Sequence, residues 1–468
     1  MATGAGVTGV TPRAGQGRGT GRRTGRRAFA APSDRPLPPP LDPGALAAPL
    51  DRPPAAPADR RAFAAPLDRG TVAARLDRPL AAAALAAVLL AVLLGARVAA
   101  SGGLSGLVVA GDAFVGPDRP ADLAVVHEDS TGYDGQFVYR LAADPFTRDE
   151  TAYGITLDNP TYRQQRLGLS LAAWTLHRTL RLPLSAALPL VNALALVAAA
   201  WAGGVLAQRL GRNALWGVLA ALSPGLVVAV TRDLTEPLAT ALLLLGLVAW
   251  TGRGRWGTAL GTAAFTGAVL TRETTLAVVA GLGLYEVYRL SRPAADAART
   301  ARPAAARRAA LLLVPLAGYV AWQVRLRGVW GETPLHATDG NVGVPFLGTV
   351  RHLFAHDASW TDWRTTDALL AHAWVGERLL LAALVVVTFA ALRRSAVPNA
   401  VKAGWLLAAL VGTAAAWERD VAFLRAANEA LALGVLVLLG LRTRVATAAL
   451  AATAGLSVFV AGLYGVAL

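Results

Sequence analysis

The segment with the clearest chemical potential reads YDGQFVYR at residues 133–140 and follows the first long apolar stretch. Its carboxylate, Asp134, can accept a proton from a hydroxyl group. Gly135 permits a close backbone approach, and the flanking aromatic rings suit the headgroup depth of a membrane. We interpret Asp134 as a functional acid with Tyr133 and Gln136 as candidate substrate-binding neighbours. A loop-structuring Asx turn is the alternative.

Four more short segments combine acids with arginines beside apolar stretches. They are LDNPTYRQQR at 157–166 with Arg163 and Arg166, TRDLTEP at 231–237 with Asp233 and Glu236, TRETT at 271–275 with Arg272 and Glu273, and WERD at 417–420 with Arg425 shortly after. Pro237 suits the first turn of a helix, and the acids before it suit the positive end of that helix. Taken alone, TRDLTEP or TRETT is explained equally well by an interfacial ion pair or a helix cap.

The composition places the chain among polytopic membrane proteins. Of its 468 residues, 54% are apolar and only 16% are charged, and the apolar residues form many long runs. This pattern excludes a soluble enzyme. The absence of cysteine excludes disulfides and thiolate metal sites. The formal charge of +15 comes from 45 basic residues, which lie mostly in the N-terminal region and in short loops.

Residues 1–79 form a separate region rich in Arg, Pro, Ala and Gly, with 13 arginines and six aspartates. This region is too polar and too often interrupted by proline to bury a core, so we expect a disordered, solvated cytoplasmic tail. A basic arm can also bind anionic lipid, and an incorrectly assigned start codon is another explanation. The tail lacks the interleaved aromatic residues that stack on bases, so we expect no nucleic-acid partner.

Eleven apolar segments follow, most of them near the roughly 17–25 residues that a membrane-spanning helix needs. They lie at 80–98, 184–207, 214–230, 235–251, 256–270, 274–290, 309–325, 375–392, 400–417, 427–441 and 444–467. We therefore predict an all-α polytopic membrane domain over 80–468, with about eleven transmembrane helices. The short apolar run 167–176 suits a juxtamembrane, re-entrant or interfacial helix better than a span. Long outer loops are then expected at 99–183 and 326–374.

The distribution of basic residues predicts which side of the membrane each loop faces, because short cytoplasmic loops carry excess Arg and Lys. With a cytoplasmic N-terminus in the plasma membrane and 167–176 not spanning, each inner loop is basic. Residues of these inner loops include Arg209, Arg212, Arg393, Arg394, Lys402, Arg442 and Arg444. The acids then meet at the outer face: Asp134, Asp233 with Glu236, Glu273, and Glu418 with Asp420. Arg325 and Arg327 are exceptions on the outer side, where an anionic ligand would explain them.

The order of these features resembles the GT-C class of integral-membrane glycosyltransferases. The resemblance is carried by YDGQFVYRLAADP, LDNPTYRQQRLGLSLAAWTL, TRDLTEP and AVLTRETTL, within about residues 80–430. Together these stretches are similar to bacterial mannosyltransferase-like members that depend on lipid-linked sugars. The resemblance implies an inverting transfer of a hexosyl or pentosyl group at the outer membrane face. The expected donor is a polyprenyl-phosphate-linked sugar in the membrane lipid, and the expected acceptor is a hydroxyl group of a glycan or lipid.

The resemblance also implies roles for individual residues. Asp134 matches the acid of the first outer loop that acts as general base, and Asp233 or Glu236 would supply the second acidic position. Arginine suits bidentate contact with the carrier phosphate. The candidates for substrate or phosphate contact are Arg163, Arg166, Arg272, Glu273 and Arg425, with Arg325 and Arg327 as lipid-phosphate anchors.

We expect no metal cofactor. The first outer loop lacks an Asp-x-Asp pair, so a divalent metal is not supported, and a monophosphate-lipid donor does not obviously require one. His352 and His356 could place two ligands on one helical face. The aromatic residues around them favour an amphipathic segment on the membrane surface instead.

A multi-pass transporter or lipid-carrier flippase is the alternative function, because intramembrane charges can line a translocation path. Two features of the sequence argue against it. The long first loop concentrates polar residues at one face, and no inverted repeat of Gly/Pro-broken segments is evident. A non-catalytic scaffold is a third interpretation, and it would tolerate the loss of Asp134.

Overall fold

The structure, a computed structural model, describes residues 77–464 apart from 253, 255, 293–301, 335–342, 355–364 and 415–421. The N-terminal residues 1–76, His356, Glu418 and Asp420 therefore lie outside the described residues. Within the described part the regular secondary structure is almost entirely helical, and the four strands there have two residues each. The prediction of an all-α polytopic membrane fold is confirmed.

Ten of the eleven expected apolar segments each correspond to one helix. Five helices in the described part are long and apolar enough to cross a membrane: α2 (Pro79–Ala100), α6 (Leu184–Arg209), α13 (Arg302–Trp330), α16 (Thr366–Ala391, apolar over Ala368–Ala391) and α20 (Arg444–Gly462). Five others are shorter, with 12–17 residues: α9 (Glu236–Trp250), α10 (Gly257–Thr271), α11 (Thr275–Ser291), α17 (Asn399–Ala414) and α19 (Asn428–Leu439).

The expected span at 214–230 is not one helix. It is divided into η4 (Ala214–Trp216), α7 (Gly217–Ala221) and α8 (Pro224–Val230). The break lies at Ser223, whose extended backbone (φ −61°, ψ 155°) is the conformation favoured before proline. Pro224 also lacks the N–H that would continue the helical hydrogen bonds. The prediction of a continuous helix here is wrong, and α8 leads instead into the TRDLTEP segment.

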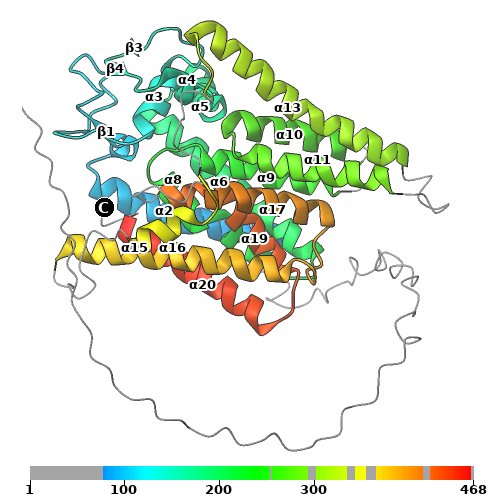
Figure 1. The fold of residues 1–468 in the computed structure, drawn as a ribbon. Coiled ribbons are helices and arrows are strands. Elements are labelled where there is room, and N and C mark those ends of the chain that lie inside the picture. The colour runs from blue at the N-terminus through cyan, green and yellow to red at the C-terminus, as the bar shows by residue number, and fades with distance from the viewer. Residues whose placement is uncertain are drawn as a thin grey trace, which may run out of the picture. The chain divides into compact units, whose positions relative to one another are not determined.

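Residues 99–183, expected as a long loop, form a folded layer. It contains η3 (Leu104–Val108), β1 (Ala110–Gly111), β2 (Val126–His127), α3 (Gly135–Ala143), β3 (Thr151–Ala152), β4 (Ile155–Thr156), α4 (Pro160–Gln164) and the 14-residue α5 (Leu167–Leu180). A small apolar core holds the layer against the start of α6 through Val108, Tyr139, Ile155, Leu169 and Leu188. Figure 1 shows α3, α4 and α5 gathered beside the end of α13. This layer positions the segments 133–140 and 157–166.

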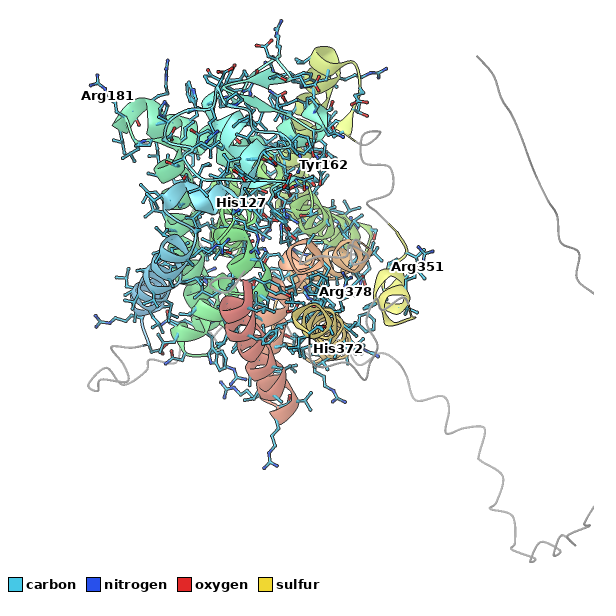
Figure 2. The ribbon with its side chains drawn as sticks, turned by 90° about the vertical axis from the view of Figure 1, so that its left-hand side faces the viewer. His127, Tyr162, Arg181, Arg351, His372 and Arg378 are labelled. Carbon is cyan, nitrogen blue, oxygen red and sulfur yellow. The ribbon has the colours of Figure 1, made fainter. Side chains whose placement is uncertain are left out.

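The region expected as a second large loop, 326–374, is partly helical. It contains the end of α13, α15 (Leu347–Phe354) and the first turns of α16. Helix α16 begins earlier than its apolar run because Thr365 caps it, accepting a hydrogen bond from the Ala368 N–H at 3.2 Å. In Figure 2, Arg351 on α15 and His372 and Arg378 on α16 lie lower in the view than His127 and Tyr162 of the folded layer.

Small residues let the shorter helices pack closely. A Cβ atom at Gly246 of α9 would come within 2.5 Å of the Phe265 ring of α10. One at Gly281 of α11 would come within 2.5 Å of the Ala403 carbonyl oxygen of α17. In lipid, where helix association lacks a strong hydrophobic driving force, such close approach supplies van der Waals contact. This packing holds α9 and α11, at whose beginnings the acidic segments lie.

Candidate active site

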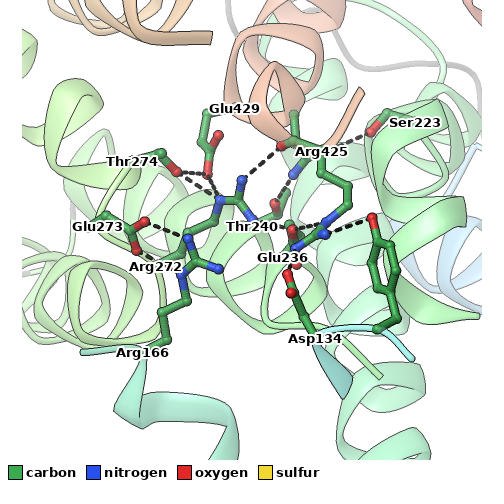
Figure 3. A network of polar contacts seen from close by, with 12 residues as sticks. Asp134, Arg166, Ser223, Glu236, Thr240, Arg272, Glu273, Thr274, Arg425 and Glu429 are labelled. Carbon is green, nitrogen blue, oxygen red and sulfur yellow. Dashed lines mark hydrogen bonds and ion pairs between the residues drawn. The ribbon is translucent and has the colours of Figure 1, made fainter. Parts of the chain in front are cut away.

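Eight of the ten predicted site residues lie in one polar network, most of which Figure 3 shows. They come from the start of α3, from α4 and the residues after it, from the start of α9, from the α10–α11 connection, and from α18 (Ala422–Ala426). The eight are Tyr133, Asp134, Arg163, Arg166, Glu236, Arg272, Glu273 and Arg425. Segments far apart in the sequence thus meet where the folded layer covers the helical bundle.

Asp134 immediately precedes α3 and accepts hydrogen bonds from two guanidiniums. Its Oδ1 lies 2.6 Å from Arg163 Nη1, and its Oδ2 lies 2.9 Å from Arg425 Nη2. The side chain is 26% exposed, so it lies at the edge of the network. Burial by itself raises the pKa of Asp134, but the charges of Arg163 and Arg425 lower that pKa well below its usual range. The carboxyl group is therefore ionised at neutral pH.

Gly135 explains how α3 approaches the TRDLTEP segment so closely. A Cβ atom at this position would lie 2.5 Å from the backbone oxygen of Arg232 and 2.6 Å from that of Val108. Neither backbone atom can move away as a flexible side chain would. The close backbone approach expected from the sequence is present, and it brings Asp134 next to the start of α9.

Arg425 joins Asp134 to Glu236. Besides its bond to Asp134, it donates from Nε to Glu236 Oε1 at 2.6 Å and from Nη1 to the Tyr133 hydroxyl at 3.0 Å. Glu236 is the first residue of α9 and is fully buried, and it also forms an ion pair with Arg272. A buried carboxylate is tolerated only when cations and hydrogen bonds compensate its lost hydration. Two guanidiniums supply that compensation here.

The two arginines of LDNPTYRQQR have separate acidic partners. Arg163 donates from Nε and Nη2 to Asp158, at 2.7 and 2.6 Å, in addition to its bond with Asp134. Arg166 donates from Nε and Nη2 to Glu273, at 3.0 and 2.7 Å. Burial raises the pKa of Glu273, but the charge and hydrogen bonds of Arg166 lower that pKa to about 2. Arg166 therefore fastens the folded layer to the α10–α11 connection.

The two glutamines between these arginines bind α13. Gln164 is buried, and its backbone oxygen accepts from Trp322 Nε1 at 3.2 Å while its Oε1 accepts from Trp330 Nε1 at 2.7 Å. The Gln164 amide donates to the carbonyl oxygens of Pro145 and Thr147, both at 3.1 Å. Both polar atoms of the Gln164 side chain therefore have hydrogen-bond partners. Gln164 holds the short helix α4 at an angle that directs Arg163 towards Asp134.

Two acids of the network, Glu429 and Asp158, were not singled out as site residues from the sequence. Glu429 at the start of α19 is buried, lies 3.4 Å from Arg272 Nε, and accepts from the Thr274 hydroxyl at 2.8 Å. Asp158 is the second partner of Arg163. Asp158 directly precedes Asn159, the N-cap residue of α4, and an acid at such a position is a sequence signal that could have identified it. Glu429 lies at the beginning of an apolar run, where an unpaired acid would be costly, and that position is also a signal.

Asp233 and Gln136 lie outside the network. Asp233 is fully buried in a left-handed conformation (φ 49°), and neither of its carboxylate oxygens has a hydrogen-bond partner among the described residues. Burial raises the pKa of Asp233 well above its usual range, with the Asn192 amide as its polar neighbour. Gln136 accepts from the Gly111 N–H at 3.0 Å and donates to the Thr131 carbonyl oxygen at 2.7 Å. It therefore stabilises the loop before α3.

The cations and carboxylates of the network nearly balance. Four guanidiniums, from Arg163, Arg166, Arg272 and Arg425, face five carboxylates, from Asp134, Asp158, Glu236, Glu273 and Glu429. Among the described residues, no group of three His, Cys, Asp or Glu side chains is arranged to hold a metal ion. Each of the five carboxylates directs at least one oxygen at a guanidinium.

A small cavity adjoins Asp134. Its volume is about 20 Å³, which is room for about one water molecule. Polar side chains from both the layer and the bundle line it, together with apolar ones: Arg163, Arg166, Ser170, Thr235 and Arg425, with Phe137, Val138, Leu141 and Leu234. A molecule much larger than water reaches Asp134 through this space only when the lining side chains move.

The two arginines predicted as lipid-phosphate anchors lie apart from the acids. Arg325 is exposed on α13, and its guanidinium lies 5.7 Å from the ring centroids of both Phe146 and Trp322. Arg327 is also exposed. These residues lie on the same end of α13 that binds Gln164, so they are near the folded layer but outside the ion-pair network.

Comparison with known proteins gives few matches. No protein-family model matches the sequence, and no curated protein matches it. Among solved structures, the chain is similar to the arabinofuranosyltransferase AftD from mycobacteria, determined by single-particle cryo-EM, with a TM-score of 0.44 and 19% sequence identity. The match covers 85% of this chain and 27% of AftD, so the chain spans about a quarter of the length of that protein.

Proposed function

We propose that this chain is a membrane glycosyltransferase that moves a sugar from a polyprenyl-phosphate carrier to a hydroxyl group of a glycan or lipid acceptor at the outer membrane face. One observation supports this most strongly: Asp134, an ionised carboxylate, lies between Arg163 and Arg425. Glycosyl transfer to an alcohol needs a group that accepts the hydroxyl proton. It also needs cations that stabilise the departing phosphate, for which arginine is suited.

The proposed reaction is a single displacement. The acceptor oxygen forms a bond to the anomeric carbon of the sugar while the bond from that carbon to the carrier phosphate oxygen breaks. The hydroxyl proton passes to the Asp134 carboxylate, which acts as general base. The phosphate leaves with the electron pair as polyprenyl monophosphate. Attack opposite the leaving group inverts the configuration at the anomeric carbon.

The two arginines control how basic Asp134 is. While both guanidiniums are bonded to it, their charges lower its pKa, and the carboxylate is a weak base. A general base is most effective when its pKa lies near the working pH. In the proposed mechanism, the donor phosphate replaces Asp134 as the acceptor for Arg163 Nη1 and Arg425 Nη2, while Glu236 keeps its bond to Arg425 Nε. Asp134 then loses their charge but keeps its burial, and its pKa rises. Donor binding thereby prepares the base for the acceptor.

The deeper acids have positioning roles in this proposal. Glu236 is fully buried and holds Arg425 and Arg272, so it orients the phosphate-binding cations rather than meeting the sugar. Glu273 does the same for Arg166. Glu236 is therefore the second acid of the site in preference to Asp233, which makes no ion pair in the described part of the chain.

A transfer assay tests the proposal. The full-length protein is reconstituted in liposomes with a radiolabelled polyprenyl-phosphate sugar and a glycan or lipid acceptor fraction. Asp134→Asn should reduce transfer by at least about 100-fold, as removal of a general base commonly does. Asp158→Asn is the matched control, because it removes another carboxylate bonded to Arg163 while leaving the base in place.

Two results would sink the proposal. The first is Asp134→Asn protein that is folded and transfers sugar as fast as the parent. The second is a parent protein that carries the labelled lipid from one leaflet to the other without forming a glycosylated product, which would favour the flippase interpretation.

A further inference from the structure

A cavity unrelated to the candidate active site lies at the start of α20. It has a volume of about 740 Å³, within the range of small-molecule binding sites. Three arginines from two distant segments line it, together with small and hydroxylated residues: Arg212, Arg442 and Arg444, with Gly211, Thr443, Thr447, Ala448 and Ala451. Among the described residues, none with an acidic side chain lines this cavity.

Two of these arginines are uncommitted. Arg442 and Arg444 are exposed, and within the part of the chain that the structure describes neither has an ion-pair or hydrogen-bond partner. The Arg442 Nη2 atom lies next to Gly211, 3.3 Å from where a Cβ of that residue would be. This differs from the candidate active site, where every guanidinium of the network is bonded to a carboxylate.

The third arginine has a fixed position. Arg212 donates from Nε to the Leu439 carbonyl oxygen at 2.9 Å and from Nη2 to the Leu441 carbonyl oxygen. These are backbone acceptors at the end of α19, so the side chain keeps its full positive charge. The lining of the cavity therefore combines one cation held by backbone hydrogen bonds with two others that have no such partner among the described residues.

The cavity is charged at one end and apolar along its length. Arg444, Thr447, Ala448 and Ala451 follow the i, i+3, i+4, i+7 spacing of one helix face, and all four are exposed. Seven residues of α-helix advance by about 10 Å, so the cavity extends from the arginines along α20 for that distance. Helix α20 is apolar and long enough to cross a membrane. An occupant that matches this lining has an anionic head and an apolar tail.

We infer that this cavity binds the phosphate headgroup of an anionic membrane lipid, with the first part of the acyl chain lying over Ala448 and Ala451. Guanidiniums bind phosphate through paired N–H donors, and the Thr443 hydroxyl, which accepts from the Ala446 N–H, adds a neutral donor. Basic pockets between membrane helices are known to take such headgroups. A free phosphate ion carries the same anionic group, but it has no apolar part that would contact Ala448 and Ala451. This inference does not depend on the proposed glycosyl transfer.

Native mass spectrometry of the full-length protein in detergent tests the inference, with phosphatidylglycerol as anionic probe and phosphatidylcholine as zwitterionic probe. The parent should retain phosphatidylglycerol preferentially. The double variant R442Q/R444Q should bind it about 30-fold more weakly, since each arginine near a lipid surface contributes roughly a fivefold effect. The matched control is R393Q/R394Q, which removes two exposed arginines that do not line the cavity.

Ala451→Trp separates the lipid from a free anion, because it fills the apolar floor without changing charge. It should weaken phosphatidylglycerol binding and leave the retention of inorganic phosphate unchanged. Equal phosphatidylglycerol binding by the parent and R442Q/R444Q would overturn the inference. So would an equal loss in R393Q/R394Q, or inorganic phosphate that displaces phosphatidylglycerol at millimolar concentration, which would identify a site for free phosphate.

Discussion

Arg425 donates from Nε to Glu236 at 2.6 Å, and this bond fixes the plane in which its guanidinium lies. The remaining nitrogens consequently point to Asp134 and to the Tyr133 hydroxyl. A residue close to the C-terminal end of the chain thereby sets the geometry of an acid in the first folded layer.

Arg425→Lys should reduce kcat/KM for sugar transfer by roughly 10- to 100-fold. A lysine keeps the charge, but its ammonium group is a point charge that cannot bond Asp134 and Glu236 in the fixed geometry of a guanidinium. Hydrogen bonds to charged groups contribute about 1.5–3 kcal/mol, which corresponds to that range. Steady-state kinetics measure the effect, with Arg444→Lys as control. Kinetics of Arg425→Lys that match the parent would mean that the bridge is unimportant.

The Arg166–Glu273 pair predicts a pH dependence of stability. The charge of Arg166 lowers the pKa of Glu273 from its ordinary value of 4.5 to about 2, so the folded state prefers the ionised form. The stability from this pair is fully present above about pH 4.5 and is lost as the pH falls towards 2. Glu273→Gln should therefore lower Tm at pH 7, and the difference from the parent should shrink between pH 4.5 and 3. The exposed acid Glu128, changed to Gln, is the control. A Tm difference that stays constant down to pH 3 would contradict the assignment.

Gln164→Leu should raise KM for the lipid-linked donor by about tenfold while changing kcat less. Losing the bonds to Trp330, Pro145 and Thr147 frees α4, which carries a predicted phosphate-binding arginine. Gln165→Leu is the control, because Gln165 is also buried but accepts only one long hydrogen bond in its side chain, 3.4 Å from Tyr319. A simple loss of folded protein would lower the amount of active enzyme in both variants without the selective change in KM.

Single cysteines test the predicted topology, since the chain contains no native cysteine. A cysteine at the exposed Glu128 should react with an impermeant thiol reagent added to intact cells. One at the exposed Arg394 should react only after permeabilisation. Labelling of Arg394→Cys but not Glu128→Cys in intact cells would place the candidate site on the cytoplasmic side. Labelling at both positions would contradict the predicted topology between them, because both would then face outward.

The apolar runs predict most helices because a membrane leaves the backbone no other way to satisfy its hydrogen bonds. They fail at 214–230, where Pro224 divides an apolar run that hydropathy alone makes continuous. Helix ends are also poorly predicted from hydropathy. Helices α13 and α16 both extend past their apolar runs, because polar residues at their ends also adopt the helical conformation.

Eight of the ten predicted site residues lie in one network because acids and arginines next to apolar runs have few partners other than each other. The sequence does not say which acid meets which arginine. Asp233 and Glu236 lie three residues apart at the start of the same helix. Glu236, the first residue of α9, binds Arg425, whereas Asp233, in a left-handed conformation, forms no ion pair among the described residues. The backbone conformation at these two positions decides which acid joins the network, and the sequence does not show that conformation.

The near balance of guanidiniums and carboxylates has a consequence for how substrate arrives. Long-range attraction needs a net charge, and its effect on association rates falls steeply with ionic strength. Four cations and five anions leave this site with little net charge, so its long-range attraction for a phosphate is weak. Capture of a lipid-linked donor then depends on lateral diffusion in the bilayer, and turnover should change little when salt is added.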